Sequence, residues 1–227
     1  MEEIVLIDAH AHLEELEDLS GALSEAKSSG VKAIVAVGMD LDPNRRTLEI
    51  AQTNRGVVFP AIGYHPWKIK ENEVEKNLIF IKDHVQECIA LGEIGLDYKV
   101  HVKKDLQCRV FGEILDLAAE YDKPVILHCR FSHKRTYEMV VERGIRRTIF
   151  HWYSGPLDLS DKILESGYFI SATPALAHSP LHQQGTSNCN AQGKQPRSLT
   201  IALRVAPKGN KYAYRGNQVR PQRPMLS

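Results

Sequence analysis

The feature that most constrains the fold of this chain is a regular alternation of short apolar runs and amphipathic stretches, which extends to about residue 172. Short apolar runs rich in β-branched residues are typical of buried strands. They occur at Ile4–Asp8, Val31–Val37, Val57–Ile62, Cys88–Gly92, Pro124–His128, Thr148–His151 and Tyr168–Ser171. Helical spacing occurs between them at Leu19–Ser28, Asn44–Thr53, Val74–His84, Lys104–Tyr121 and Leu157–Glu165. This order predicts an α/β fold with a parallel sheet covered by helices.

The number of these units favours closure of the sheet. Seven strand–helix units are too many for a small open sheet, and the natural arrangement is a (β/α)8 TIM barrel. Closure needs an eighth strand, and Ser198–Ala206 is the later segment with the pattern of a strand. We therefore predict a barrel that is incomplete or irregular at the eighth strand. A doubly wound open sheet is the alternative.

Two histidines follow the first apolar run, in His10-Ala11-His12. Side chains two residues apart on a strand point the same way, so these two imidazoles converge on one point. Ring nitrogens placed in this way suit a divalent metal ion. Asp8 lies on the same face and is expected to orient a ligand imidazole. A histidine pair on the surface without a ligand is the alternative.

Polar residues also follow the later strands, where the catalytic groups of such barrels lie. They are His65, Glu93, His128 with Arg130, and His151. Each has an ordinary alternative: a turn before proline for His65, a buried ion pair for Glu93, a core position for His128 and a surface ion pair for Arg130. Together with His10 and His12, these residues can form a two-metal site bridged by Glu93. The remaining histidines, expected at the surface or behind the site, are His84, His101, His133, His178 and His182.

These residues stand in motifs that resemble those of the TatD family of metal-dependent deoxyribonucleases, within the amidohydrolase-like barrels. The motifs are His10-Ala11-His12, Gly63-Tyr64-His65-Pro66, Gly92-Glu93-Ile94-Gly95-Leu96-Asp97-Tyr98, His128-Cys129-Arg130 and His151-Trp152-Tyr153-Ser154-Gly155. The resemblance covers roughly residues 4–180. It implies a (β/α)8 fold and hydrolysis of DNA phosphodiester bonds, with single strands or 3′ ends as the expected substrate.

The resemblance also implies a role for each residue. His10, His12 and Glu93 would hold one divalent ion, and Glu93, His128 and His151 would hold the other. His65 and Arg130 match positions that face the substrate phosphate, so Glu93, His65 and Arg130 are the expected catalytic residues. The residue types do not distinguish Zn²⁺, Mg²⁺ and Mn²⁺.

The last part of the chain departs from the family. All 28 acidic residues lie at or before Glu165, and the rest of the chain contains eight Lys and Arg. The family has an Asp after strand eight that ligates a metal, and this chain has no acidic residue there. We therefore divide the chain into a barrel, residues 1–183, and a basic, divergent tail, residues 184–227, whose composition is typical of loops or disorder. A shift of the reading frame near residues 183–185 is the simplest explanation, and we expect reduced activity if the tail is genuine.

Two other functions remain open on the sequence alone. One is a deacylase or lactonase of the amidohydrolase type, which would use the same metals. The other is a nucleic-acid-binding protein without catalysis, which would use the basic tail. The cysteines form no CxxC pair and are expected to be reduced thiols, and no apolar stretch approaches the roughly 20 residues that span a bilayer. We therefore expect a cytoplasmic protein that does not act at a membrane.

Overall fold

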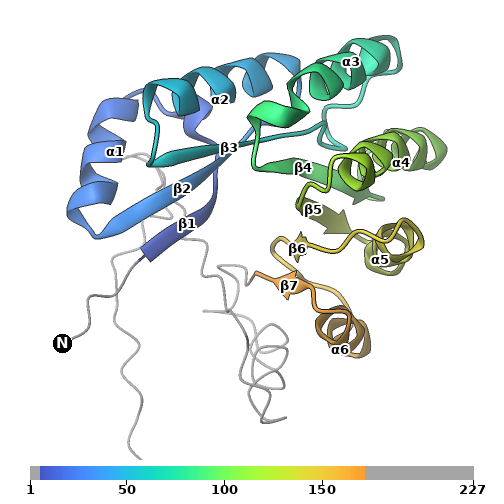
Figure 1. Ribbon diagram of the computed structural model, residues 1–227. Helices are drawn as coiled ribbons and strands as arrows, with labels where there is room; N and C mark the ends of the chain where they lie inside the picture. The colour runs from blue at the N-terminus through green and yellow to red at the C-terminus, as the bar shows by residue number, and fades with distance from the viewer. Residues whose placement is uncertain (1–5, 172–227) are drawn as a thin grey trace, which may run out of the picture.

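The computed structural model describes residues 6–171. Seven parallel strands form one sheet in the order β1-β2-β3-β4-β5-β6-β7, so each strand pairs with the next strand along the chain. The sheet curls, and the helices lie on its outer side (Figure 1). The predicted α/β barrel is confirmed over the described residues. The strand expected at Ser198–Ala206 and the tail, residues 184–227, lie outside them.

The elements follow one another as strand and helix with short connections. The strands are β1 (Leu6–Ala11), β2 (Val31–Val37), β3 (Val58–Ile62), β4 (Ala90–Asp97), β5 (Val125–Arg130), β6 (Thr148–Phe150) and β7 (Phe169–Ile170). The α-helices are α1 (Leu19–Ser28), α2 (Leu41–Thr53), α3 (Val74–His84), α4 (Lys104–Glu120), α5 (His133–Glu142) and α6 (Leu157–Glu165). Short 3₁₀ helices occur at Leu13–Glu15, Glu71–Glu73 and Val85–Glu87.

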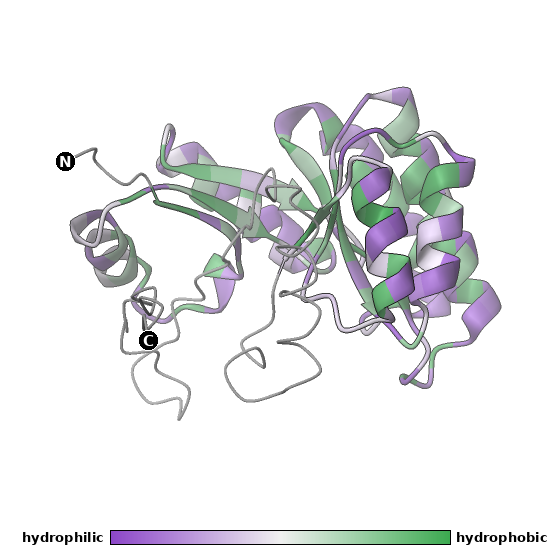
Figure 2. Ribbon diagram, turned by 90° about the horizontal axis from the view of Figure 1, so that it is seen from below, coloured by the Kyte–Doolittle hydropathy of each residue, from purple (hydrophilic) through white to green (hydrophobic). Residues whose placement is uncertain are grey.

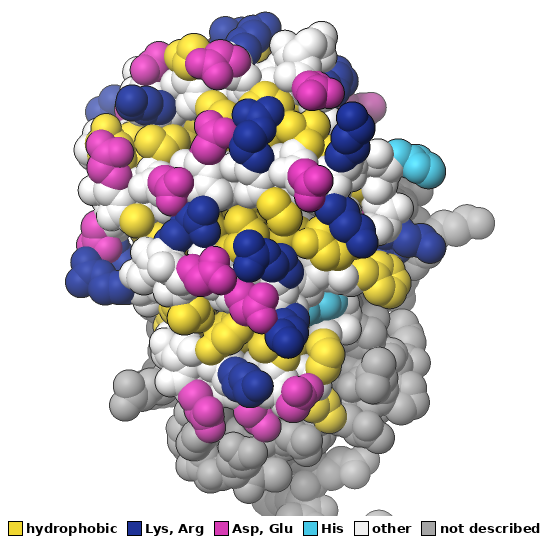
Figure 3. Space-filling model, turned by 90° about the vertical axis from the view of Figure 1, so that its right-hand side faces the viewer, with side chains coloured by type: hydrophobic (Ala, Val, Ile, Leu, Met, Phe, Trp, Pro, Cys, Tyr) yellow, Lys and Arg dark blue, Asp and Glu magenta, His cyan; other side chains and the backbone are white. Residues whose placement is uncertain are grey.

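Apolar packing between the sheet and its helices holds the strands in place. Every residue of β4 is buried, and Leu91, Ile94 and Leu96 belong to the same core cluster as Phe111 and Leu115 of α4. The helices carry both hydrophobic and hydrophilic residues (Figure 2), and the face in Figure 3 has Lys and Arg interspersed with Asp and Glu. None of the helices in the described part of the chain is long and apolar enough to cross a membrane.

The structure extends three strands beyond their predicted ends. β1 continues to Ala11, β4 to Asp97 and β5 to Arg130, so His10 and Glu93 lie within strands instead of after them. The prediction for β4 ended at Gly92, whereas the strand continues through Glu93, Ile94 and Gly95. α5 is a further helix whose polar first turn gave little helical signal in the sequence.

Two buried amide side chains fix the strand ends that carry the site. Asn44 of α2 donates from Nδ2 to the carbonyl of Gly63 at 2.8 Å and accepts from the N–H of Gly63 at 3.1 Å. Gln107 of α4 does the same at the end of β4, where it accepts from the N–H of Asp97 at 2.8 Å and donates to its carbonyl at 2.9 Å. Both side chains thus make the backbone hydrogen bonds that a neighbouring strand would make if its pairing continued to these residues.

Replacing Asn44 with Ala is expected to destabilise the protein. The change leaves the N–H and C=O of Gly63 without their partners in a buried place, which costs about 1–3 kcal/mol. Urea unfolding followed by circular dichroism measures this as a lower midpoint with an unchanged slope. Gln52→Ala, at an exposed position of the same helix, is the control and should leave the midpoint close to that of the unaltered protein. Equal midpoints for the two variants would contradict this role of Asn44.

Candidate metal centre

The carboxyl ends of the strands bring the predicted ligands together around the carboxylate of Glu93. Glu93 is 5% exposed, and its Oε2 lies 3.3 Å from His10 Nε2 and 4.0 Å from His12 Nε2. Its Oε1 lies 3.2 Å from His128 Nδ1 and 3.8 Å from His65 Nε2. Each carboxylate oxygen therefore faces a different pair of imidazoles, as a carboxylate that bridges two ions requires.

The sixth residue of the cluster, His151, follows β6 and packs against His10. The two rings stack with their centroids 3.7 Å apart and their planes 8° from parallel. His151 Nδ1 lies 3.1 Å from the hydroxyl of Ser171, which also accepts the N–H of Trp152 at 2.9 Å. The Ser171 hydroxyl therefore occupies Nδ1 of His151 and leaves Nε2 available to bind a metal ion.

The donor set fits divalent metal ions. In a tetrahedral site with ligand bonds of about 2.1 Å, neighbouring ligand atoms lie roughly 3.4 Å apart. His10 Nε2 lies 3.3 Å from His12 Nε2 and 3.3 Å from Glu93 Oε2, which is close to this spacing. Ligand atoms of His10, Glu93 and His151, and separately of His65, Glu93 and His128, lie within 4.8 Å of one another. Proximity thus groups His151 with His10, whereas the family resemblance groups it with His128.

Glu93 has the charge that a metal ligand needs. Burial alone would raise the pKa of this carboxyl group, but His10, His128 and His65 outweigh it and hold the pKa well below its usual value. The carboxylate is therefore ionised at neutral pH and acts only as an acceptor.

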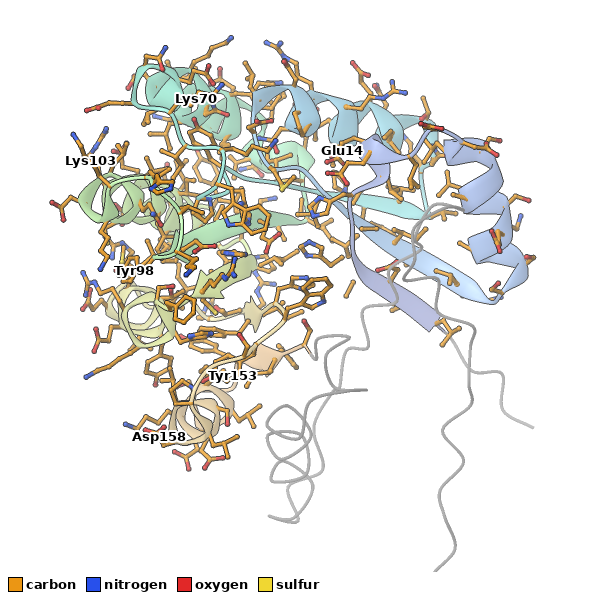
Figure 4. All side chains as sticks on the ribbon, turned by 180° about the vertical axis from the view of Figure 1, so that it is seen from behind. Glu14, Lys70, Tyr98, Lys103, Tyr153 and Asp158 are labelled. Carbon is orange, nitrogen blue, oxygen red and sulfur yellow. The ribbon has the colours of Figure 1, made fainter. Side chains whose placement is uncertain are left out.

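The carbonyl of Val37 fixes the orientation of His12. His12 Nδ1 lies 2.8 Å from this oxygen, and because a carbonyl only accepts, Nδ1 carries the proton. His12 Nε2 then presents its lone pair to the space beside Glu93, as a metal ligand must. The carboxylate of Glu14 lies 3.7 Å from the same Nδ1 and is nearly buried. Glu14 was not among the predicted site residues; Figure 4 shows it well separated from Tyr98 and Tyr153.

His65 has the opposite tautomer. The N–H of Trp67 donates to His65 Nδ1 at 3.2 Å, so in a neutral ring the proton lies on Nε2. Burial lowers the pKa of His65 to about 3, which keeps the ring neutral. Nε2–H of His65 then points toward Glu93 as a hydrogen-bond donor. A protonated nitrogen has no free lone pair, so it suits contact with a phosphate oxygen better than ligation of a metal.

Asp97 is a site residue to which the sequence analysis assigned no role. It is fully buried, and its Oδ2 accepts from His128 Nε2 at 3.0 Å and from the indole N–H of Trp67. Burial opposes the charged form of His128, but Glu93 and Asp97 outweigh burial and raise its pKa. Asp97 therefore fixes Nε2–H of His128 and leaves Nδ1 for a ligand facing Glu93. The available signal was the place of Asp97 four residues after Glu93, at the end of the same strand.

Two further predicted residues, Asp8 and Arg130, are not among the residues around the Glu93 carboxylate. Asp8 does not orient an imidazole within the described residues: its Oδ1 accepts the backbone N–H of His10 at 3.1 Å, the local bond that Asp forms two residues along the chain. Burial raises the pKa of Asp8 to about 6. Arg130 lies at the exposed end of β5, outside the cluster around Glu93, where it lines a groove next to the site.

Comparison with known proteins shows the family of this chain. Residues 7–192 match the family described as TatD related DNase. The chain belongs to this family. It is 30% identical over 187 residues to the putative deoxyribonuclease tatdn3 of Danio rerio, covering 75% of this chain and 70% of the relative. It is 30% identical over 189 residues to the uncharacterized metal-dependent hydrolase MJ1582 of Methanocaldococcus jannaschii, covering 81% and 74%.

A solved TatD structure has the same fold. YjjV, a TatD homologue from Escherichia coli K12, matches with a TM-score of 0.65 and 28% identity, covering 73% of this chain and 67% of YjjV. The prediction of a TatD-type metal-dependent hydrolase that acts on ester bonds is therefore confirmed at the level of the family.

Replacing Asp97 with Asn is expected to weaken the TatD centre without removing a ligand. The amide keeps the size of the side chain but loses the charge that holds Nε2–H of His128, and losing such a partner typically costs 10–100-fold in metal affinity or activity. Metal titration by calorimetry measures the loss. Asp83→Asn, at an exposed position of α3, is the control. An Asp97→Asn variant that binds metal as tightly as the control would show that Asp97 has no such role.

Proposed function

We propose that this TatD-family chain hydrolyses phosphodiester bonds in DNA, with two divalent ions bound around Glu93. The observation that supports this most is the placement of Glu93, with each carboxylate oxygen facing a different pair of imidazoles. The relative from Danio rerio is named a putative deoxyribonuclease. Zn²⁺, Mg²⁺ and Mn²⁺ all remain compatible with these ligands.

In this proposal the ligand residues follow the family resemblance. His10, His12 and Glu93 hold one ion, and Glu93, His128 and His151 hold the other. The ions supply Lewis acidity and lower the pKa of bound water. His65 donates from Nε2–H to a phosphate oxygen, in keeping with the tautomer that Trp67 imposes. Arg130 at the rim binds the phosphate backbone of the strand.

The missing carboxylate after strand eight limits the chemistry. Loss of one oxygen ligand weakens a site for hard cations and removes a candidate base. Among the described residues, Asp97 already accepts hydrogen bonds from His128 and Trp67, and Glu93 is the proposed ligand of both ions. Neither carboxylate therefore replaces that base. We therefore expect slower hydrolysis than in a relative that has the Asp.

The substrate and location complete the proposal. Single-stranded DNA, trimmed from a 3′ end, fits a centre that is recessed at the strand ends. Cys88, Cys108 and Cys129 are free thiols, which supports a reducing, cytoplasmic location. A deacylase or lactonase function would use the same ligands and is distinguished by substrate.

Cleavage of labelled single-stranded DNA by the purified full-length chain tests the function. We expect slow, metal-dependent shortening from a labelled 3′ end, and no shortening with His128→Ala. Amide or lactone hydrolysis without DNA cleavage would favour the alternative. No cleavage of any of these substrates by metal-loaded protein would contradict hydrolysis by this chain.

A further inference from the structure

A groove of about 870 Å³ lies next to the proposed metal centre. Its walls come from the segments that follow β4, β5 and β6, including Tyr98, residues 130–135 and residues 154–157. The same strands carry Glu93 and His128, and His151 directly follows β6. Tyr98 and Tyr153, from the segments after β4 and β6, lie on one side of the molecule (Figure 4). The groove therefore begins where the strands of the metal centre end.

Arg130 connects the centre and the groove. His128 and Arg130 are two residues apart on β5, so their side chains leave the same face of the strand, while Cys129 between them is buried in the core. The N–H of Tyr98 donates to the carbonyl of Arg130 at 3.0 Å, which holds the two walls together. A strand of nucleic acid whose reacting phosphate lay at the metals would continue past Arg130.

The charged residues of the groove favour an anion. Arg130, Lys134 and Arg135 line it with a single acidic residue, Glu138, whereas the outer face in Figure 3 mixes both signs. Lys134 and Arg135 lie 3.9 Å from Glu138, and Arg135 lies 3.4 Å from Glu142 beyond the groove, but such exposed pairs are weak.

Lys134 and Arg135 lie in the first turn of α5. A positive charge there is unfavourable for the helix because it lies at the positive end of the helix dipole. The N-cap residue, Ser132, donates its hydroxyl to the carbonyl of Leu96 at 2.6 Å and does not cap the helix. The first amides of α5 therefore have no side-chain cap and add to the attraction for an anion. The ion pairs of Lys134 and Arg135 with Glu138 and Glu142 further along α5 stabilise the helix only weakly.

Two exposed aromatic residues have strained backbone conformations: Phe131 lines the groove, and Trp152 stacks on His151 of the metal centre. Phe131 is 70% exposed with φ 55°, and Trp152 is 36% exposed with φ 46°. Asp122 is the one other described residue besides glycine with a positive φ. Bulky residues rarely adopt this conformation, and when they do they cluster at ligand sites. Exposed rings beside cations are the elements that bind single-stranded nucleic acid.

We propose that this groove binds the DNA strand adjacent to the cleaved bond, with one base stacked on Phe131 and phosphates on Arg130, Lys134 and Arg135. This inference rests on the proposed function and extends it to a second binding site beyond the metals. A base can stack on Phe131 only when it is not stacked within a duplex. The groove therefore selects single strands.

Binding of a labelled phosphorothioate oligothymidylate, which resists hydrolysis, tests the proposal by fluorescence anisotropy. Phe131→Ala should lower the affinity about 10-fold, because stacking on an aromatic ring contributes on the order of this factor per base. Phe131→Tyr keeps the ring and should bind like the unaltered chain. Lys134→Ala/Arg135→Ala should reduce the slope of log K against log salt by about 1.4, since each phosphate contact on a single strand contributes about 0.7.

The control is Lys76→Ala/Lys82→Ala, which removes the same charge from exposed positions of α3 and should leave the salt slope unchanged. Unchanged binding by Phe131→Ala and by the Lys134/Arg135 double variant would overturn the proposal. Equal affinity for a duplex of the same length would also overturn it. If the oligothymidylate binds as expected and the matching unmodified DNA is not cleaved, the proposed function fails while the groove is supported.

Discussion

The variant Glu93→Gln is expected to lower kcat/KM for phosphodiester hydrolysis by about 10³-fold or more. Glu93 is the proposed ligand shared by both ions, and a bound metal contributes several kcal/mol of transition-state stabilisation. At about 1.4 kcal/mol for each factor of ten, a loss of about 4 kcal/mol corresponds to 10³-fold. Gln keeps the shape of the side chain but lacks the charge that faces His10 and His128.

Initial rates on labelled single-stranded DNA measure this effect at a fixed metal concentration. Glu87→Gln, at an exposed position before β4, is the matched control and should retain the rate of the unaltered chain. Circular dichroism establishes that Glu93→Gln is folded. A folded Glu93→Gln variant with a kcat/KM close to that of the control would remove Glu93 from the mechanism.

Removal of metal is expected to abolish hydrolysis and to lower the thermal midpoint of the protein. A ligand that binds only the folded state, present at 100 times its dissociation constant, stabilises it by about 2.7 kcal/mol. For a chain of this size, this corresponds to a shift of roughly 5–10 °C. Dialysis against a chelator followed by thermal unfolding, with and without added Zn²⁺ or Mn²⁺, measures the shift.

The shift should depend on pH, because histidine ligands must be neutral to bind a metal. Glu93 and Asp97 raise the pKa of His128, so protons compete with the metal at this residue more strongly than at an ordinary histidine. The stabilisation by metal is therefore expected to be larger at pH 8 than at pH 6. Midpoints that do not respond to metal at either pH would contradict a metal centre in this protein.

The sequence predicted the parts of the fold and site that depend on local pattern. Alternating apolar and amphipathic segments gave α1, α3 and α6 with the residue bounds that the structure has. His10, His12, His65, Glu93, His128 and His151 were found because each lies at or near the end of a strand, and the structure brings all of them together.

The parts that the sequence did not predict depend on contacts between distant segments. Asp97 acts through His128, 31 residues away, and Asn44 acts through Gly63, 19 residues away. The local pattern does not show which distant partner such a polar residue contacts. The tautomer of His65 likewise depends on the direction of one backbone N–H, that of Trp67.

Anomalous scattering from crystals of the full-length chain grown with Mn²⁺ or Zn²⁺ tests the central claim most directly. We predict two anomalous peaks in contact with Glu93, one also at ligand distance from His10 and His12 and the other from His128 and His151. Ligand distances of about 2.0–2.2 Å are expected. Metal-containing crystals with no peak at Glu93 would contradict the proposed centre, and with it the proposed hydrolysis.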